Sequence, residues 1–263
     1  MQTDASVQLD FDGPVATIRL NRPYAMNALD VAGFRAFGEA VFQLRERSDL
    51  RAVVIRGEGK AFMAGADLAE LAADFDAAPQ TLVAMIDALH PALATLSELP
   101  QPVIAAVHGA VAGAGVSLML ACDFAIAADN TRFSLAYARI AGSLDGGGSW
   151  TLPRVVGRRK ALEIAMLDEP FDAAEALRLG MLNEVVPPAE FEAAVKKLTD
   201  RLASGPTLSY GKIKSLMRVA YENDLPSQLG RERAAFASCA ASSDFREGVT
   251  AFLKKRTPGF EGR

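Results

Sequence analysis

The pattern of apolar and polar positions along the chain predicts strands and helices that follow one another. Short apolar runs at 52–55, 103–107 and 124–127 are typical of buried strands, because both faces of such a strand are covered. The first two runs lead through glycines into apolar residues at helical spacing, and the third leads into further sheet. This order predicts an α/β fold with a parallel β/α core.

The rest of the pattern predicts an N-terminal hairpin and a series of helices. Residues 7–11 and 15–20 alternate around a turn, as expected for two antiparallel strands at a sheet edge. Asp30 is a candidate N-cap for the first helix. Two prolines end a further strand at 182–186. The predicted helices cover 29–44, 81–99, 152–156, 160–167, 172–179, 191–203, 208–221, 226–241 and 244–255. Gly205-Pro206 divides the chain into a β/α part, 1–204, and a helical part, 205–263.

The segment 103–122 carries the first chemical signal. Its strand ends in a glycine-rich turn, and helical spacing resumes at Ser117. Backbone N–H groups at the start of a helix have no intrahelical acceptor, and the helix dipole favours negative charge there. The segment therefore predicts a site for an anion or oxyanion. A glycine turn without a ligand is the alternative, whereas His108 and the glycines disfavour a membrane span.

Two other stretches extend this signal. The segment 52–71 repeats the order of strand, glycine turn and helix start, with Gly65 in the turn. Two such units can place two backbone donors at one site. A second glycine cluster, 141–150, contains one carboxylate, Asp145, and leads into a helix.

Composition narrows the class of protein. The chain has 263 residues, half of them hydrophobic, which is ample for a large core. A net charge of −4 argues against a nucleic-acid-binding surface. Two cysteines provide neither a disulfide framework nor a metal-ligand cluster. The N-terminal segment lacks the pattern of an export signal, so we expect a cytoplasmic protein.

Six segments together resemble the enoyl-CoA hydratase/isomerase (crotonase) superfamily, and they extend over nearly the whole chain. They are LNRPYAMNAL (20–29), AFMAGADL (61–68), PVIAAVHGAVAGAG (102–115), DGGGSWTLPRVVG (145–157), AEALRLGMLNEVV (174–186) and SSDFREGVTAFLKKRTPGF (242–260). Each alone is modest evidence, whereas six in the right order are strong. The glycine loop and the C-terminal tail are most similar to the ring-epoxide phenylacetyl-CoA isomerase branch.

The resemblance implies a crotonase-like spiral core that binds an acyl-CoA thioester. It also implies that the helical region 205–263 forms trimers, often as a dimer of trimers. The two oxyanion donors of the family correspond to the N–H groups of Ala66 and Ala114. Residues implied to contact CoA are Ala64, Ala66 and Leu68, with Lys254 and Lys255 reaching a CoA phosphate in their own or a neighbouring subunit. We expect no metal, no redox cofactor, no nucleic acid and no membrane.

The chain departs from the hydratase pattern at two positions. Ser117 and Tyr137 stand where typical hydratases carry the two glutamates that handle water. Asp145 stands where the isomerase branch carries an aspartate. One carboxylate can move a proton between two carbons, whereas hydration also requires an activated water. The resemblance therefore implies an isomerase that uses Asp145 as proton shuttle, with enoyl-CoA hydratase as the alternative.

Other roles remain open for these residues. His90 matches the water-activating base of the chlorobenzoyl-CoA dehalogenases, and with Asp145 as nucleophile it allows a hydrolytic reaction. Asp145 is also a candidate cap of the following helix. Ser117 and Tyr137 are expected to face the acyl pocket without transferring protons. A protein that binds CoA or RNA without catalysis is a further alternative.

Overall fold

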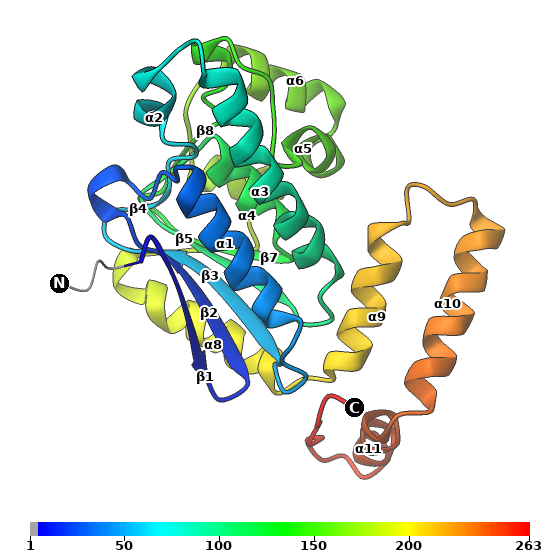
Figure 1. Ribbon diagram of the computed structural model, residues 1–263. Helices are drawn as coiled ribbons and strands as arrows, with labels where there is room; N and C mark the ends of the chain where they lie inside the picture. The colour runs from blue at the N-terminus through cyan, green and yellow to red at the C-terminus, as the bar shows by residue number, and fades with distance from the viewer. Residues whose placement is uncertain (1–4) are drawn as a thin grey trace.

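The computed structural model describes residues 5–263 and contains a six-stranded sheet at its centre (Figure 1). Met1–Asp4, which belong to the segment examined for an export signal, lie outside the described residues. The strand order is β1-β2-β3-β5-β7-β10. The strands are β1 (Val7–Asp12), β2 (Val15–Leu20), β3 (Ala52–Gly57), β5 (Val103–Val107), β7 (Phe124–Ala128) and β10 (Glu184–Val186). From β2 to β10 all neighbours are parallel, which confirms the predicted core.

The N-terminal hairpin is also confirmed. β1 pairs antiparallel with β2 in a register that places Val7 opposite Leu20 and Asp12 opposite Val15. β1 forms one edge of the sheet, as its alternating pattern predicts.

Of a second sheet of four short strands, only the third was predicted, as the further sheet that follows 124–127. Its order is β4-β6-β8-β9, and its strands are β4 (Ala61–Met63), β6 (Ala110–Ala112), β8 (Arg132–Ser134) and β9 (Phe171–Asp172). β6 lies inside the segment interpreted as a turn, and the helix after it begins at Ala114 rather than Ser117. Strands of two or three residues are too short to show a period of two, so their pairing depends on tertiary contacts.

Helices cover both faces of the six-stranded sheet. The α-helices of residues 5–263, not all of which touch this sheet, are α1 (Val31–Leu44), α2 (Leu68–Ala73), α3 (Ala78–Glu98), α4 (Ala114–Ala121), α5 (Gly148–Val156), α6 (Arg158–Leu167), α7 (Ala173–Arg178), α8 (Phe191–Ala203), α9 (Thr207–Arg218), α10 (Leu225–Ala240) and α11 (Ser243–Leu253). Val53 and Ile55 belong to the core on the side of α1 and α3, whereas Val54 packs with residues of α8. Asp30 caps α1 as predicted, since its Oδ1 accepts a hydrogen bond from Gly33 N at 2.7 Å.

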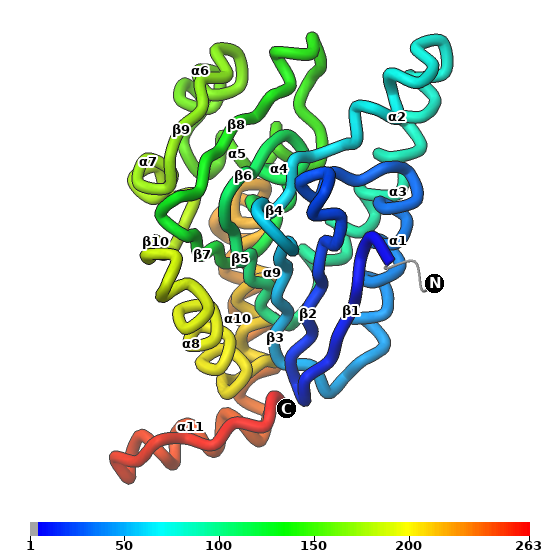
Figure 2. The backbone as a smooth tube through the Cα atoms, turned by 90° about the vertical axis from the view of Figure 1, so that its left-hand side faces the viewer, coloured from blue at the N-terminus to red at the C-terminus, as the bar shows by residue number. Residues whose placement is uncertain are grey.

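The last three helices form an arm beside this core. Figures 1 and 2 show α9 and α10 side by side, with α11 at the opposite end of the molecule from α2. α9 packs on α3, whereas α10 packs mainly on α9 and α11. Large apolar side chains of the arm face solvent, among them Phe236, Phe252 and Leu253. Among residues 5–263, no helix is long and apolar enough to cross a membrane.

Candidate functional site

Two glycine turns, one after β4 and one after β6, bring the predicted oxyanion donors close together. Gly65 has a φ of +98° and Gly113 a φ of +53°, a region that costs other residues conformational energy. A Cβ atom on Gly65 would stand 3.2 Å from Ala114 N, so the first turn lies directly against the start of α4. Glycine at position 65 thus permits the close approach of the two turns.

The N–H groups of Ala66 and Ala114 donate no hydrogen bond within residues 5–263. Ala114 is the first residue of α4, where an N–H group lacks an intrahelical acceptor and the helix dipole is positive. The N–H groups beside them are engaged: Asp67 N donates to Leu29 O, and Gly113 N donates to Ser134 O. The structure therefore leaves unpaired donors at both predicted positions.

The segment 22–30 braces the first of these turns. Asn27 is fully buried, and its amide donates hydrogen bonds to Glu58 O and Ala61 O at 2.9 and 2.7 Å. The Arg22 guanidinium binds Ala28 O at 2.6 Å and the Asp67 carboxylate at 3.0 Å. Sequence reasoning used this segment to identify the family and missed its role, because the partners outside the segment lie 31 to 45 residues away.

Asp145 lies in the loop before α5, and it is held at both its side chain and its backbone. The Tyr137 hydroxyl donates a hydrogen bond to Asp145 Oδ1. Burial, and then the negative charge of Asp145, raise the pKa of Tyr137 well above its ordinary value, so the phenol keeps its proton. The Asp145 carbonyl accepts from Ser117 Oγ at 2.9 Å and from Gly148 N at 2.9 Å.

The alternative in which Asp145 caps α5 is wrong. The N-cap of α5 is Gly147, which makes no side-chain cap, and the Asp145 carboxylate is directed to Tyr137 instead. The glycines that follow Asp145 let the loop turn toward Tyr137, because Gly146 and Gly147 both have positive φ. The Asp145 carboxylate is therefore free of a structural role in the helix.

Ser117 joins the Asp145 loop to the helix that carries the oxyanion donor. It lies three residues after Ala114 on α4, about 4.5 Å along the helix axis. A Cβ atom on Gly148 would stand 2.8 Å from Ser117 Oγ, and one on Gly146 would stand 2.9 Å from Ser117 Cβ. The loop thus packs tightly on a small, fully buried side chain.

The structure brings His90 to the same loop. His90 lies on α3, and its Nε2 accepts a hydrogen bond from Gly146 N at 3.3 Å. That bond occupies the lone pair that a general base would use. His108 lies elsewhere, with Nε2 at 3.0 Å from Gly59 O and its ring against Phe191.

The predicted CoA contacts are not all in one place. Ala64 lies in the turn just before Ala66, and Leu68 begins α2 with an exposed side chain. Lys254 and Lys255 follow α11, at the opposite end of the molecule from α2 (Figures 1 and 2). Within one chain the two lysines therefore do not lie near the other predicted CoA contacts at 64–68.

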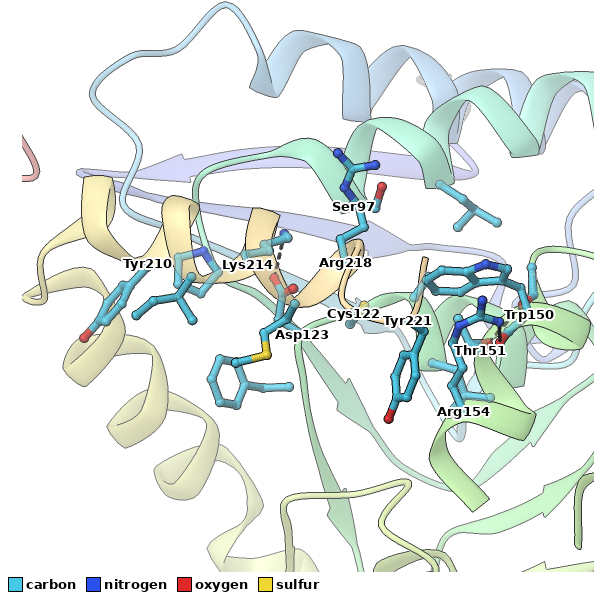
Figure 3. Close-up of a pocket in the computed structure, with 18 of the residues that line it drawn as sticks. Ser97, Cys122, Asp123, Trp150, Thr151, Arg154, Tyr210, Lys214, Arg218 and Tyr221 are labelled. Atoms are coloured by element: carbon cyan, nitrogen blue, oxygen red, sulfur yellow. Dashed lines mark hydrogen bonds and ion pairs between the residues drawn. The ribbon is translucent and has the colours of Figure 1, made fainter. Parts of the chain in front are cut away.

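A cavity of about 700 Å³ lies between α9 and the C-terminal end of α4 (Figure 3). Its wall contains an ion pair of Lys214 and Asp123 at 2.7 Å, and the Arg154 guanidinium lies 3.9 Å from the Trp150 ring centre. None of the predicted site residues lines it, although Gly146 and Gly147 do. The loop that carries Asp145 therefore also forms part of the wall of this cavity.

Comparison with known proteins agrees with the fold and the motifs. The enoyl-CoA hydratase/isomerase family model matches residues 10–263. A "Probable enoyl-CoA hydratase" of Rhodobacter capsulatus is 38% identical over 98% of both chains. The 1,2-epoxyphenylacetyl-CoA isomerase of Escherichia coli is 36% identical over 95% of both chains. The crystal structure of an enoyl-CoA hydratase from Polaromonas sp. JS666 has a TM-score of 0.91 at 37% identity, covering 97% of this chain and 99% of that one. The chain therefore belongs to the enoyl-CoA hydratase/isomerase family.

Proposed function

We propose that this protein is an acyl-CoA isomerase that moves a proton between two carbons of a thioester substrate. The observation that carries the proposal is the placement of Asp145, whose carboxylate is held by Tyr137 beside the helix that begins at Ala114. In the cluster of His90, Ser117, Tyr137 and Asp145, only Asp145 supplies a carboxylate. The similarity to the Escherichia coli isomerase supports the same proposal.

The proposed mechanism begins with charge on the thioester oxygen. Removal of the α-proton forms an enolate, whose oxygen accepts hydrogen bonds from the N–H groups of Ala66 and Ala114. Each such donor contributes roughly 10²–10³ to the rate. Asp145 Oδ1 is engaged by Tyr137, and Oδ2 has no hydrogen-bond partner among residues 5–263, so Oδ2 is the oxygen that takes the proton. The same carboxyl group then returns the proton to another carbon, and no electrons are gained or lost.

Hydratase activity is the second candidate, and the name of the Rhodobacter capsulatus relative favours it. Hydration needs a base for the water and an acid for the carbon. The Ser117 hydroxyl acts neither as an acid nor as a base at neutral pH. The raised pKa of Tyr137 makes its phenol a poor source of protons. Hydrolysis through His90 is disfavoured because its Nε2 accepts the Gly146 N–H. These observations support isomerisation over both alternatives.

We also propose that the chain assembles as a trimer or a dimer of trimers. The exposed apolar side chains of α10 and α11 support assembly, because such surfaces on one chain are usually covered by another. In that assembly Lys254 and Lys255 would contact a CoA phosphate bound to a neighbouring subunit. The reaction as proposed needs no metal and no redox cofactor.

The test compares wild type with Asp145→Asn on a panel of CoA thioesters. Double-bond migration, ring-epoxide isomerisation, water addition to crotonyl-CoA and thioester hydrolysis are measured separately. Asp145→Asn should lower isomerisation about 10²–10⁴-fold, the usual contribution of a general base. Asp87→Asn, an exposed aspartate on α3, serves as the matched control. Equal turnover by wild type and Asp145→Asn would overturn the proposal, and so would faster hydration than isomerisation.

A further inference from the structure

We propose that Asp168 is a positioning residue that holds the Tyr137 hydroxyl against the Asp145 carboxylate. This inference rests on the proposed function, since it concerns the same carboxylate. Asp168 follows α6 and does not touch Asp145. Its side chain is 3% exposed, although aspartate is rarely buried so completely unless it is paired.

The contacts of Asp168 fall on both sides of Tyr137 along the chain. Before Tyr137, Asp168 Oδ1 accepts hydrogen bonds from Ser134 Oγ at 3.0 Å and Ala136 N at 2.8 Å. After Tyr137, Arg139 Nε lies 2.9 Å from Asp168 Oδ2, and the guanidinium also donates to the Asp168 carbonyl at 2.6 Å. The segment 134–139 is therefore fastened at both ends to one residue.

The backbone on either side of Tyr137 adopts conformations that other contacts must maintain. Ala136, directly before Tyr137, has a φ of +59°, and Ala141 has a φ of +56°. Non-glycine residues rarely adopt this region, so contacts elsewhere must maintain it. The Ala136 N–H bond to Asp168 provides such a contact. Asp168 also adopts a positive φ, of +50°, so its own backbone is shaped to face the segment.

The position of Tyr137 affects the reacting atoms through one hydrogen bond. Tyr137 Oη donates to Asp145 Oδ1, which orients the carboxylate and leaves Oδ2 for the substrate. A displacement of about 1 Å in a reacting group can cost on the order of 10²-fold in rate. Loss of the Asp168 contacts should therefore lower kcat through the position of Tyr137, with little change in KM.

The test uses Asp168→Gly, which removes the side chain and keeps the positive φ accessible. We expect Asp168→Gly to lower kcat about 10–10²-fold. Asp168→Asn keeps an oxygen acceptor for Ser134 and Ala136 and should recover most of that loss. If Asp168 acts through Tyr137, adding Asp168→Gly to Tyr137→Phe should lower kcat little further. If the loss of kcat in the double variant equals the product of the losses in the two single variants, the inference is contradicted.

A spectroscopic measurement separates this inference from the proposed function. The chain contains four tyrosines, so 3-fluorotyrosine labelling gives few ¹⁹F resonances, and Tyr137→Phe assigns the relevant one. Asp145→Asn and Asp168→Gly should both shift this resonance, whereas Asp168→Asn should leave it near its wild-type position. An unmoved resonance in folded Asp168→Gly would refute the positioning role whatever the enzyme catalyses. If Asp168→Gly does not fold, Arg139→Gln removes both contacts that fasten the segment after Tyr137, including the bond to the Asp168 carbonyl that Asp168→Asn keeps, and should shift the resonance in the same direction.

Discussion

Ser117 determines how closely the Asp145 loop can approach α4. The side chain is fully buried, donates to the Asp145 carbonyl, and has the backbone of Gly146 and Gly148 packed on it. The family resemblance places a glutamate of typical hydratases at this position. In this chain a longer side chain would occupy space that the loop fills, so the loop and Ser117 depend on each other.

This packing predicts that Ser117→Glu will not create a hydratase. The added carboxylate must displace the loop or be buried without a partner, so we expect a loss of stability of about 1–3 kcal/mol from overpacking alone. Isomerisation should fall because Asp145 moves with the loop. Urea unfolding and the CoA thioester panel measure the two effects.

Ser117→Ala is the matched control for that prediction. It removes one hydrogen bond without adding volume, and should cost about 1 kcal/mol. A stable Ser117→Glu variant that adds water to crotonyl-CoA at an ordinary enzymatic rate would show that the loop yields to a larger side chain.

At the scale of elements, the sequence predicted the features that hydrophobic periodicity and glycine positions determine locally. The strands of the main sheet, the N-cap of α1 and the bounds of α8 all follow from local pattern. β4, β6 and β9 were missed because two or three residues carry no readable period, whereas β8 was predicted as further sheet after β7. The start of α4 was placed three residues late, because its first turn contains glycine and alanine rather than large apolar residues.

The candidate site divides in the same way. Glycine turns indicated the two segments that supply backbone donors, since such donors depend on local conformation, and the family resemblance identified Ala66 and Ala114 within them. The pairing of Tyr137 with Asp145, and the clamp made by Asp168, join residues through side chains on separate elements. No spacing rule predicts these contacts, so they required the three-dimensional structure.

The end of the chain provides a prediction about pH. Glu247 on α11 accepts two hydrogen bonds from Arg256, at 2.6 and 2.7 Å, and one from Gly259 N at 2.8 Å. The Arg256 guanidinium, with Gly259 N, lowers the pKa of Glu247 from 4.5 to about 2. Because the folded pKa lies below the unfolded one, this stabilisation is present above pH 4.5 and is lost as pH falls toward 2.

We therefore expect residues 256–263 to loosen between pH 5 and pH 2, as seen by faster amide hydrogen exchange at Gly259 relative to its intrinsic rate. Glu247→Gln should show the faster exchange already at neutral pH and should lose the pH dependence. Glu39→Gln, an exposed glutamate on α1, should behave as wild type. If the amide exchange of residues 256–263 is equally slow in Glu247→Gln and in wild type, Glu247 does not hold this segment.

At the scale of the whole molecule, the position of α11 makes the proposed CoA contact a property of the assembly. Lys254 and Lys255 directly follow α11, which lies at the opposite end of the molecule from α2 (Figures 1 and 2). If these lysines bind a CoA phosphate, the site must be shared between two subunits. A shared site can be tested by mixing two impaired proteins, each of which carries the part of the site that the other lacks.

The two proteins are Asp145→Asn, which lacks the proposed base, and a double variant with Lys254→Glu and Lys255→Glu. The lysine variant should raise KM about tenfold or more, because charge-assisted contacts to phosphate contribute about 1.5–3 kcal/mol. After subunits are exchanged in a cyclic trimer, about a quarter of the sites combine an intact Asp145 with intact lysines from a neighbour. Activity at low substrate should therefore rise above that of either parent. Mixed trimers that form, as shown by native mass spectrometry, yet gain no activity would place the lysines outside the site.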